Sequence, residues 1–261
     1  MSRPRRRALV VAILLLSLVA PAFAEDASLE LEDFFPLVTR RPVLEREIEV
    51  RVNHQKNRGG RETSTVVAVD YIVLPRWQVE LAIPVIFSDP RDRASTQGVG
   101  DVEVANKVVL WRKESETVVS AGMQLTLPTG SRGRNLGGDL IVAPFWSAGL
   151  ARKNVYLVGH VEYDWSLAGP GTGEEEVDVS VAGGYRVKQL IPLLELSSVT
   201  QTREPEKKGE RRLLDRLQLY VTPGFNWEIT RTTTFGLGLQ LPLTRARAFD
   251  GTILGSLDWG F

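Results

Sequence analysis

The chain has 261 residues, no cysteine, and 32 basic against 32 acidic side chains, so its formal net charge is zero. With 43% hydrophobic and 25% charged residues, the composition is that of an ordinary folded protein and argues against wholesale disorder or a polytopic helical membrane protein. The lack of cysteine excludes disulfide scaffolds, thiolate metal sites and cysteine nucleophiles. A transmembrane β-barrel is still compatible with these figures, because its strands alternate polar and apolar residues and average to near neutrality.

Residues 1–24 have the pattern of a secretory signal peptide. Four arginines between residues 3 and 7 precede an apolar run over residues 8–20 and the tripeptide Ala22-Phe23-Ala24, which predicts cleavage after Ala24. A membrane anchor is the alternative, but the run is shorter than the roughly 20 residues that a spanning helix needs. Cleavage would remove the four arginines and leave 28 basic against 32 acidic groups, a formal charge of −4 on an exported chain.

Residues 25–43 lie between this signal peptide and the first predicted strand. We interpret them as a short N-terminal lead on the periplasmic side, or as a partial plug. Phe34, Phe35 and Pro36 would allow this stretch to dock at the mouth of the domain that follows.

From residue 45 onward, apolar residues alternate with polar ones, as in strands with one apolar face. In residues 118–127, Val119, Met123 and Leu127 share one face while Ser120 and Gln124 share the other, whereas a helix would mix the two faces. The pattern predicts twelve strands, at residues 45–54, 63–73, 78–87, 101–111, 118–127, 139–150, 155–166, 176–187, 190–200, 214–226, 233–243 and 251–261. Their lengths of 10 to 13 residues are close to the roughly 9 to 11 that a tilted transmembrane strand requires.

The connections between these strands alternate in kind. Those after the odd-numbered strands are longer and rich in glycine, proline and charge, and those after the even-numbered strands are mostly shorter. This asymmetry is typical of outer-membrane barrels. The sequence therefore predicts an all-β fold, an antiparallel up-and-down transmembrane barrel of about twelve strands over residues 44–261, in the outer membrane of a Gram-negative bacterium. The alternative is a soluble β-sandwich whose tryptophans are core anchors.

The barrel interpretation assigns a depth to each aromatic residue. It predicts a membrane-interface girdle of Trp77, Trp111, Trp227 and Trp259 at the periplasmic rim, with Trp165 and Tyr163 at the opposite rim. The chain ends on Phe261 at the end of an alternating strand, which resembles the C-terminal signal by which outer-membrane proteins are recognised for insertion. The expected partners are outer-membrane lipid and lipopolysaccharide, the barrel-assembly machinery and an unidentified small solute. No nucleic acid is expected, because the basic runs are mixed in sign.

The polar face of the strands should line a lumen. Ten acidic and three basic side chains fall on it with His160: Glu47, Glu49, Arg51, Asp70, Glu80, Glu103, Lys107, Glu162, Asp164, Asp178, Arg186, Glu195 and Asp258. An excess of carboxylates favours a cation in transit, so the expectation for an open pore is weak cation preference. The alternative is a closed barrel in which these charges form a hydrogen-bonded network, since twelve strands lie between side-chain-filled and open barrels.

Catalytic interpretations find less support in the sequence. His160, Glu162 and Asp164 share a face, but a salt-bridged cluster with Arg186 or Lys107 is the simpler interpretation. The His-x-Ser motif of outer-membrane phospholipases is missing after both His54 and His160. The glycine-rich residues 127–138 lack the lysine of a phosphate-binding loop. We therefore expect no enzyme activity, no metal and no cofactor.

Two motifs carry a resemblance to a known family. They are Gly98-x-Gly100-Asp101, which leads into a strand with Lys107, and residues 127–130, Leu-Pro-Thr-Gly, which close the next strand. On these motifs the chain resembles the outer-membrane barrel family associated with the meta-pathway of phenol degradation, although residues 70–87 lack that family's Tyr-Gly turn entry. The resemblance implies a transporter-like barrel that helps hydrophobic or aromatic compounds across the outer membrane.

The functional expectation is passive transport of a small solute. The alternatives are a non-conducting structural or adhesion barrel and an outer-membrane hydrolase.

Overall fold

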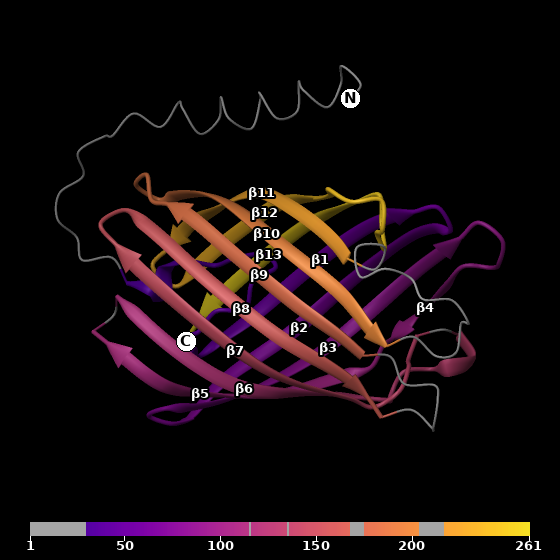
Figure 1. Ribbon diagram of the computed structural model, residues 1–261, viewed down its shortest axis with the longest axis horizontal. Helices are drawn as coiled ribbons and strands as arrows, with labels where there is room; N and C mark the ends of the chain where they lie inside the picture. The colour runs from indigo at the N-terminus through magenta and orange to yellow at the C-terminus, as the bar shows by residue number, and fades with distance from the viewer. Residues whose placement is uncertain (1–29, 115, 135, 168–174, 204–216) are drawn as a thin grey trace, which may run out of the picture.

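The computed structural model describes residues 30–114, 116–134, 136–167, 175–203 and 217–261, so the predicted signal peptide lies outside the described residues. Twelve full-length antiparallel strands form a closed barrel, joined by one short strand (Figure 1). The elements in chain order are η1 (Leu31–Asp33), β1 (Glu47–Asn57), β2 (Gly60–Leu74), β3 (Trp77–Pro90), β4 (Thr96–Val99), β5 (Val102–Lys113), β6 (Thr117–Leu127), η2 (Arg132–Arg134), β7 (Ile141–Arg152), β8 (Val155–Ser166), β9 (Glu175–Tyr185), β10 (Leu190–Arg203), β11 (Leu217–Thr230), β12 (Thr233–Pro242) and β13 (Gly251–Gly260). The prediction of an all-β barrel is confirmed.

Each full-length strand pairs with its neighbour in sequence, and β1 pairs with β13 to close the sheet. Closure satisfies the backbone hydrogen bonds that the edges of an open sheet would leave unpaired. Short turns at residues 75–76, 153–154 and 231–232 mark one end, called here the turn end. Longer connections such as residues 91–95 and 243–250 mark the other, the loop end. No helix in the described part of the chain is long and apolar enough to cross a membrane.

β4 was not predicted, because residues 88–100 read as one long loop rich in turn residues. The structure pairs Val99 with Val85, and the register shifts by one residue before Glu103 pairs with Ala82. The break falls at Gly100, whose backbone N–H donates to the Pro84 carbonyl at 2.9 Å. β4 and β5 therefore continue one another along β3 around a bulge.

The outer wall of the barrel is apolar. Exposed large apolar side chains come from every full-length strand, for example Leu81, Leu157, Leu196 and Ile253. The alternate positions point inward, where small and polar residues such as Ala82 and Ser197 are buried. A β-sandwich would bury its apolar face between two sheets, so this arrangement is that of a barrel whose outer surface faces lipid.

Residues 30–46, called here the lead segment, lie inside the turn end of the barrel. Leu31, Phe34 and Val43 are buried in a cluster with inward-facing residues of several strands, namely Val109, Val118, Ala151, Tyr156, Val158, Ala182, Ile191 and Leu193. The Phe34 ring stacks on Tyr156 with centroids 5.1 Å apart. The main apolar core thus lies within the barrel, and the lead segment supplies part of it. The C-terminus is at the same end, where the Phe261 N–H donates to the Arg46 carbonyl at 3.0 Å (Figure 1).

Candidate functional site: the lumen

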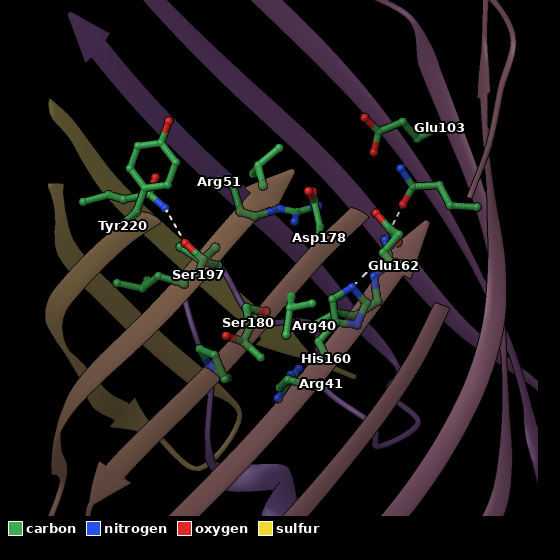
Figure 2. A pocket seen from close by; sticks show the side chains of 18 of the residues that line it. Arg40, Arg41, Arg51, Glu103, His160, Glu162, Asp178, Ser180, Ser197 and Tyr220 are labelled. Carbon is green, nitrogen blue, oxygen red and sulfur yellow. Dashed lines mark hydrogen bonds and ion pairs between the residues drawn. The ribbon is translucent and has the colours of Figure 1, made fainter. Parts of the chain in front are cut away.

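A cavity of about 590 Å³ occupies the middle of the lumen, called here the chamber (Figure 2). Its wall combines lead-segment residues with inward-facing residues of the strands. Most of the predicted lumen residues line it: Glu47, Glu49, Arg51, Asp70, Glu80, Glu103, Lys107, His160, Glu162, Asp178 and Asp258. Asp164, Arg186 and Glu195 do not.

Arg186 lies beyond the end of β9, at the turn end, and not on the chamber wall. Its guanidinium contacts the Asp33 carboxylate at 2.9 Å, a Glu228 carboxylate oxygen at 2.7 Å and the Tyr156 hydroxyl at 2.8 Å. Burial alone would lower the pKa of Arg186, but the hydrogen bonds that it donates to Glu228 and Tyr156 hold the pKa above its ordinary value. Arg186 thus follows the last residue of β9 and ties the lead segment to the barrel rim through Asp33, so it does not line the chamber.

Glu195 points inward from β10 but is completely covered by the lead segment. Its carboxylate accepts the backbone N–H groups of Leu37 at 2.6 Å, Val38 at 3.1 Å and Thr39 at 2.8 Å. Three charge-assisted hydrogen bonds to consecutive backbone groups are a strong anchor. Glu195 therefore fixes the lead segment and does not face the pathway.

Inward-facing glycines receive the apolar side chains of the lead segment. A Cβ atom built on Gly149 would lie 2.5 Å from Leu31, one on Gly184 would lie 2.5 Å from Phe34, and one on Gly238 would lie 2.5 Å from Leu37. At such distances a Cβ atom would force the facing side chain of the lead segment to move. These glycines make the room that the lead segment occupies.

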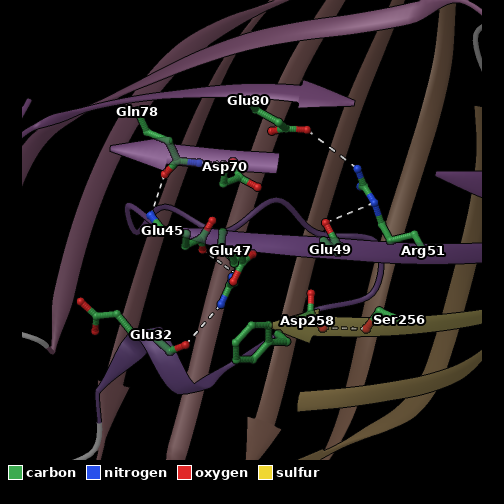
Figure 3. A network of polar contacts seen from close by, with 12 residues as sticks. Glu32, Glu45, Glu47, Glu49, Arg51, Asp70, Gln78, Glu80, Ser256 and Asp258 are labelled. Carbon is green, nitrogen blue, oxygen red and sulfur yellow. Dashed lines mark hydrogen bonds and ion pairs between the residues drawn. The ribbon is translucent and has the colours of Figure 1, made fainter. Parts of the chain in front are cut away.

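A buried ion-pair network fills the turn end of the chamber (Figure 3). The Arg41 guanidinium contacts Glu45 at 2.6 Å and Glu47 at 2.7 Å, and the Lys107 ammonium contacts Glu45 at 3.3 Å. Asp70 accepts a hydrogen bond from Gln78, which in turn accepts the Glu45 N–H at 2.7 Å. Burial raises the pKa of Glu45 to about 7, against the opposing effect of Arg41 and Lys107.

The same network contains the one group of carboxylates in the described residues that could approach a metal ion. One oxygen each of Glu45, Glu47 and Asp70 lie within 4.8 Å of one another. Arg41 and Lys107 already contact this group. Since a metal ion would compete with two fixed cations, the arrangement suits a structural ion-pair network better than a metal site.

Arg40 is a lumen residue that the sequence did not reveal. It donates to Gln124, lies 4.0 Å from Glu80, and its guanidinium sits 4.4 Å above the Phe145 ring. Arg51 contacts the same Glu80 at 3.8 Å and Glu49 at 3.3 Å. No strand periodicity marks Arg40, because it lies in the irregular lead segment and reaches the chamber only through the fold.

The part of the lumen wall formed by β8 and β9 is acidic. Glu162 lies directly across from Asp178 in the pairing of β8 with β9, and Asp164 lies across from Glu176. These four residues are called here the acid ladder. Among the described residues, none of the four carboxylates forms an ion pair with lysine or arginine. The one described basic side chain in contact with them is His160, whose Nε2 lies 3.8 Å from Glu162. The predicted salt bridges of His160, Glu162 and Asp164 with Arg186 or Lys107 are not found in the described residues, where Lys107 pairs with Glu45 and Arg186 with Asp33 and Glu228.

The interior also contains a serine–histidine pair that no local sequence motif marks. The Ser147 hydroxyl lies 2.8 Å from His160 Nδ1 because the two residues face each other across β7 and β8. Ser147 is buried and does not line the chamber. A nucleophile must reach its substrate, so this geometry does not support hydrolysis.

The connection between β12 and β13 folds inward over the loop end of the chamber. The Ala248 N–H donates to the Tyr220 hydroxyl at 2.9 Å, and the Phe249 ring stacks on Tyr220 with centroids 4.6 Å apart. Ala248 and Phe249 also line a second cavity of about 330 Å³ that includes Arg58, Arg245 and Arg247. The aromatic pair thus borders both spaces.

The predicted girdle residues lie near the barrel ends on the outer surface. Trp111, Trp227 and Trp259 are exposed at the turn end, and Trp165 is exposed at the loop end. Trp77 begins β3 at the turn end and is half-buried. The sixth tryptophan, Trp146, is exposed in the middle of β7.

Together these features define the class of protein: a closed β-barrel of the outer-membrane type, with an apolar exterior and a charged lumen that an N-terminal segment partly fills. Solved structures share this fold. The COG4313 outer-membrane channel from Pseudomonas putida F1 is 16% identical, with a TM-score of 0.67 over 92% of this chain and 100% of that one. The NanC porin is 10% identical, with a TM-score of 0.58 over 82% of this chain and 98% of its own. The KdgM porin is 10% identical, with a TM-score of 0.55 over 82% of this chain and 99% of its own.

No family model matches the chain, and no curated protein matches it. The resemblance to the phenol-degradation family therefore stays an expectation, while the likeness to the solved barrels establishes the fold.

Proposed function

We propose that this protein is a passive channel for small polar solutes in the outer membrane of a Gram-negative bacterium, with a preference for cations. The observation that carries the proposal is the chamber, a polar space of about 590 Å³ inside a barrel with an apolar exterior. The structural neighbours named as a channel and as porins are consistent with this class of function.

The preference for cations follows from the charges of the chamber wall. Ten carboxylates line it, against four basic side chains. Arg41 and Lys107 are held by Glu45, and Arg40 and Arg51 by Glu80. The acid ladder is left without such a partner in the described residues. An uncompensated negative wall lowers the energy of a cation and raises that of an anion.

The same wall argues for polar solutes over hydrophobic ones. A hydrophobic or aromatic compound, which the family resemblance implies, would have to displace water from buried charged groups at a cost in free energy. A small cation or polar molecule can replace that water with its own hydrogen bonds.

A non-conducting barrel is the second candidate, because the lead segment fills the turn end of the lumen. Both candidates are tested by reconstituting the purified barrel in a planar lipid bilayer. We expect discrete conductance steps and, under a KCl gradient, a reversal potential that indicates cation preference. A barrel with neither conductance nor solute uptake in liposomes would be a structural one.

The export and assembly steps form part of the proposal. Residues 1–24 would direct secretion, and Phe261, exposed beside the Trp259 ring, would present the insertion signal to the barrel-assembly machinery. Lipid would contact the apolar wall and lipopolysaccharide the loop end.

A further inference from the structure

The acid ladder is costly for the fold. Carboxylates directly opposite one another on paired strands repel, and this repulsion destabilises a sheet. Here two such pairs are adjacent, Glu162 with Asp178 and Asp164 with Glu176, and three of the four side chains line the chamber. A cationic ligand in the chamber would relieve the repulsion.

Hydrogen-bond acceptors without partners lie at the same place. Glu162 Oε2 and Asp178 Oδ1 are buried and accept no hydrogen bond from the described residues. Ser180 lies two residues from Asp178 on the same face of β9, lines the chamber and is only 6% exposed (Figure 2). As a chamber-wall residue, Ser180 has a hydroxyl oxygen that can accept a hydrogen bond from a ligand there. Unpaired acceptors of this kind favour a ligand that carries N–H donors.

An aromatic surface borders the same chamber. Tyr220 and Phe249 stack on each other at the loop end and line the cavity together with Asp178 and Glu176. Aromatic faces attract cations and pack against carbon chains.

We infer that the chamber contains a binding site for a protonated primary amine. The ammonium group donates to Glu162, Asp178 and Ser180, and the carbon chain lies against Tyr220 and Phe249. This inference rests on the proposed channel function, in which the chamber is the pathway. A compact metal ion fits less well, because the described residues bring three carboxylate oxygens within 4.8 Å of one another only at the ion-paired group at the turn end.

The test measures block of the K⁺ current through single barrels in a planar bilayer. 1,4-Diaminobutane, added at the loop end, should halve the current at a concentration about tenfold lower than tetramethylammonium, which is a cation without N–H donors. In the double variant Glu162→Gln, Asp178→Asn, the half-blocking concentration of diaminobutane should rise about tenfold or more. Ser180→Ala should raise it by a smaller factor. The inference would be overturned if diaminobutane blocked the double variant at the wild-type half-blocking concentration. It would also be overturned if diaminobutane and tetramethylammonium had the same half-blocking concentration.

A matched control removes two carboxylates outside the chamber. Glu62→Gln with Asp139→Asn eliminates the same charge near the loop end, where Glu62 bonds Gln55 and Asp139 bonds Arg132. For this control variant, the half-blocking concentration of diaminobutane should stay within about twofold of the wild-type value, because the hydrogen-bond acceptors of the site are intact.

The failure of the site and the failure of the channel can be told apart. If K⁺ current flows but amine block does not depend on the acid ladder, the inference is wrong and the channel proposal stands. If no current flows, calorimetric titration of diaminobutane into the detergent-solubilised barrel still tests the site. Binding that the double variant lacks would support the inference, and its absence from the wild type would overturn it.

Discussion

At the scale of single residues, the structure separates inward-facing charges into different roles. Glu195 and Glu162 both belong to the polar face of their strands, yet one is sealed beneath the lead segment and the other faces the chamber. The difference lies in their partners, since Glu195 accepts three backbone N–H groups and Glu162 has an oxygen with none in the described residues. The first is an anchor and the second is available to a ligand.

Replacing Glu195 should loosen the lead segment. Glu195→Leu leaves the N–H groups of Leu37, Val38 and Thr39 unpaired, at about 1 to 3 kcal/mol for each buried group. We expect faster tryptic cleavage after Arg40, the bond that no proline blocks, and a larger single-channel conductance. Glu195→Gln, which keeps one acceptor oxygen, should be intermediate. Cleavage and conductance unchanged in Glu195→Leu would show that the contact does not hold the segment in place.

At the scale of elements, the lead segment and the strands around it fit each other. The apolar side chains of Leu31, Phe34 and Leu37 enter spaces that exist because Gly149, Gly184 and Gly238 carry no Cβ. Ion pairs then fix the following residues to the barrel, between Arg41 and Glu47 of β1 and between Glu45 and Lys107 of β5. Apolar packing therefore holds the first part of the lead segment in the barrel, and ion pairs hold the part that follows.

The stability with which the charged residues of the lead segment are held in the barrel should depend on pH through Glu45. Because burial raises its pKa from 4.5 to about 7, the folded protein binds the proton more tightly than the unfolded chain does. The stabilisation is therefore complete below about pH 4.5 and is lost as the pH rises through about 7. Hydrogen exchange of residues 37–46, corrected for intrinsic rates, should be faster at pH 8 than at pH 5.

Glu45→Gln is the control, since its side chain is neutral at every pH. The difference in protection between pH 5 and pH 8 should shrink in this variant. An undiminished difference would contradict the assignment of the pH dependence to Glu45.

At the scale of the whole molecule, the distribution of polar and apolar side chains is the reverse of that in a soluble domain. Its polar groups and ion pairs lie in the lumen, while apolar side chains from all full-length strands face outward. This distribution is stable only where lipid replaces water around the barrel. The zero net charge of the chain is thus an average over an acidic interior, an apolar wall and loops of mixed charge.

A matched pair of charge insertions on β10 tests this distribution. Leu196 is exposed on the outer wall at the middle of the strand, and Val199 lines the chamber. Leu196→Arg should lower the free energy of unfolding in lipid vesicles by about 2 to 4 kcal/mol, because a charge near the bilayer midplane must be desolvated. Val199→Arg should cost less, since the lumen is polar. Guanidinium titration in vesicles measures both, and equal costs would contradict the assignment of the two faces.

The barrel itself could be predicted from the sequence because strand alternation is a local signal. Residues 118–127 or 233–243 show their two faces without reference to any other part of the chain. The ends of the strands differ from prediction by a few residues, and β4 was missed because its pairing depends on β3. Glu162, Asp164 and Asp178 were predicted to face the lumen, whereas Glu176 was not, and the direct opposition of the four carboxylates depends on the register of β8 with β9.

The sequence by itself determined an all-β barrel with an apolar exterior and an acidic interior, since a repeat of two residues fixes both the strand and its faces. The tertiary structure decided the rest. Glu195 meets the lead segment across more than 150 residues of chain, Ser147 meets His160 only by strand register, and Arg40 reaches the chamber from a segment without periodicity. Contacts of this kind depend on how the sheet closes and on what then fits inside it, and no local pattern encodes either.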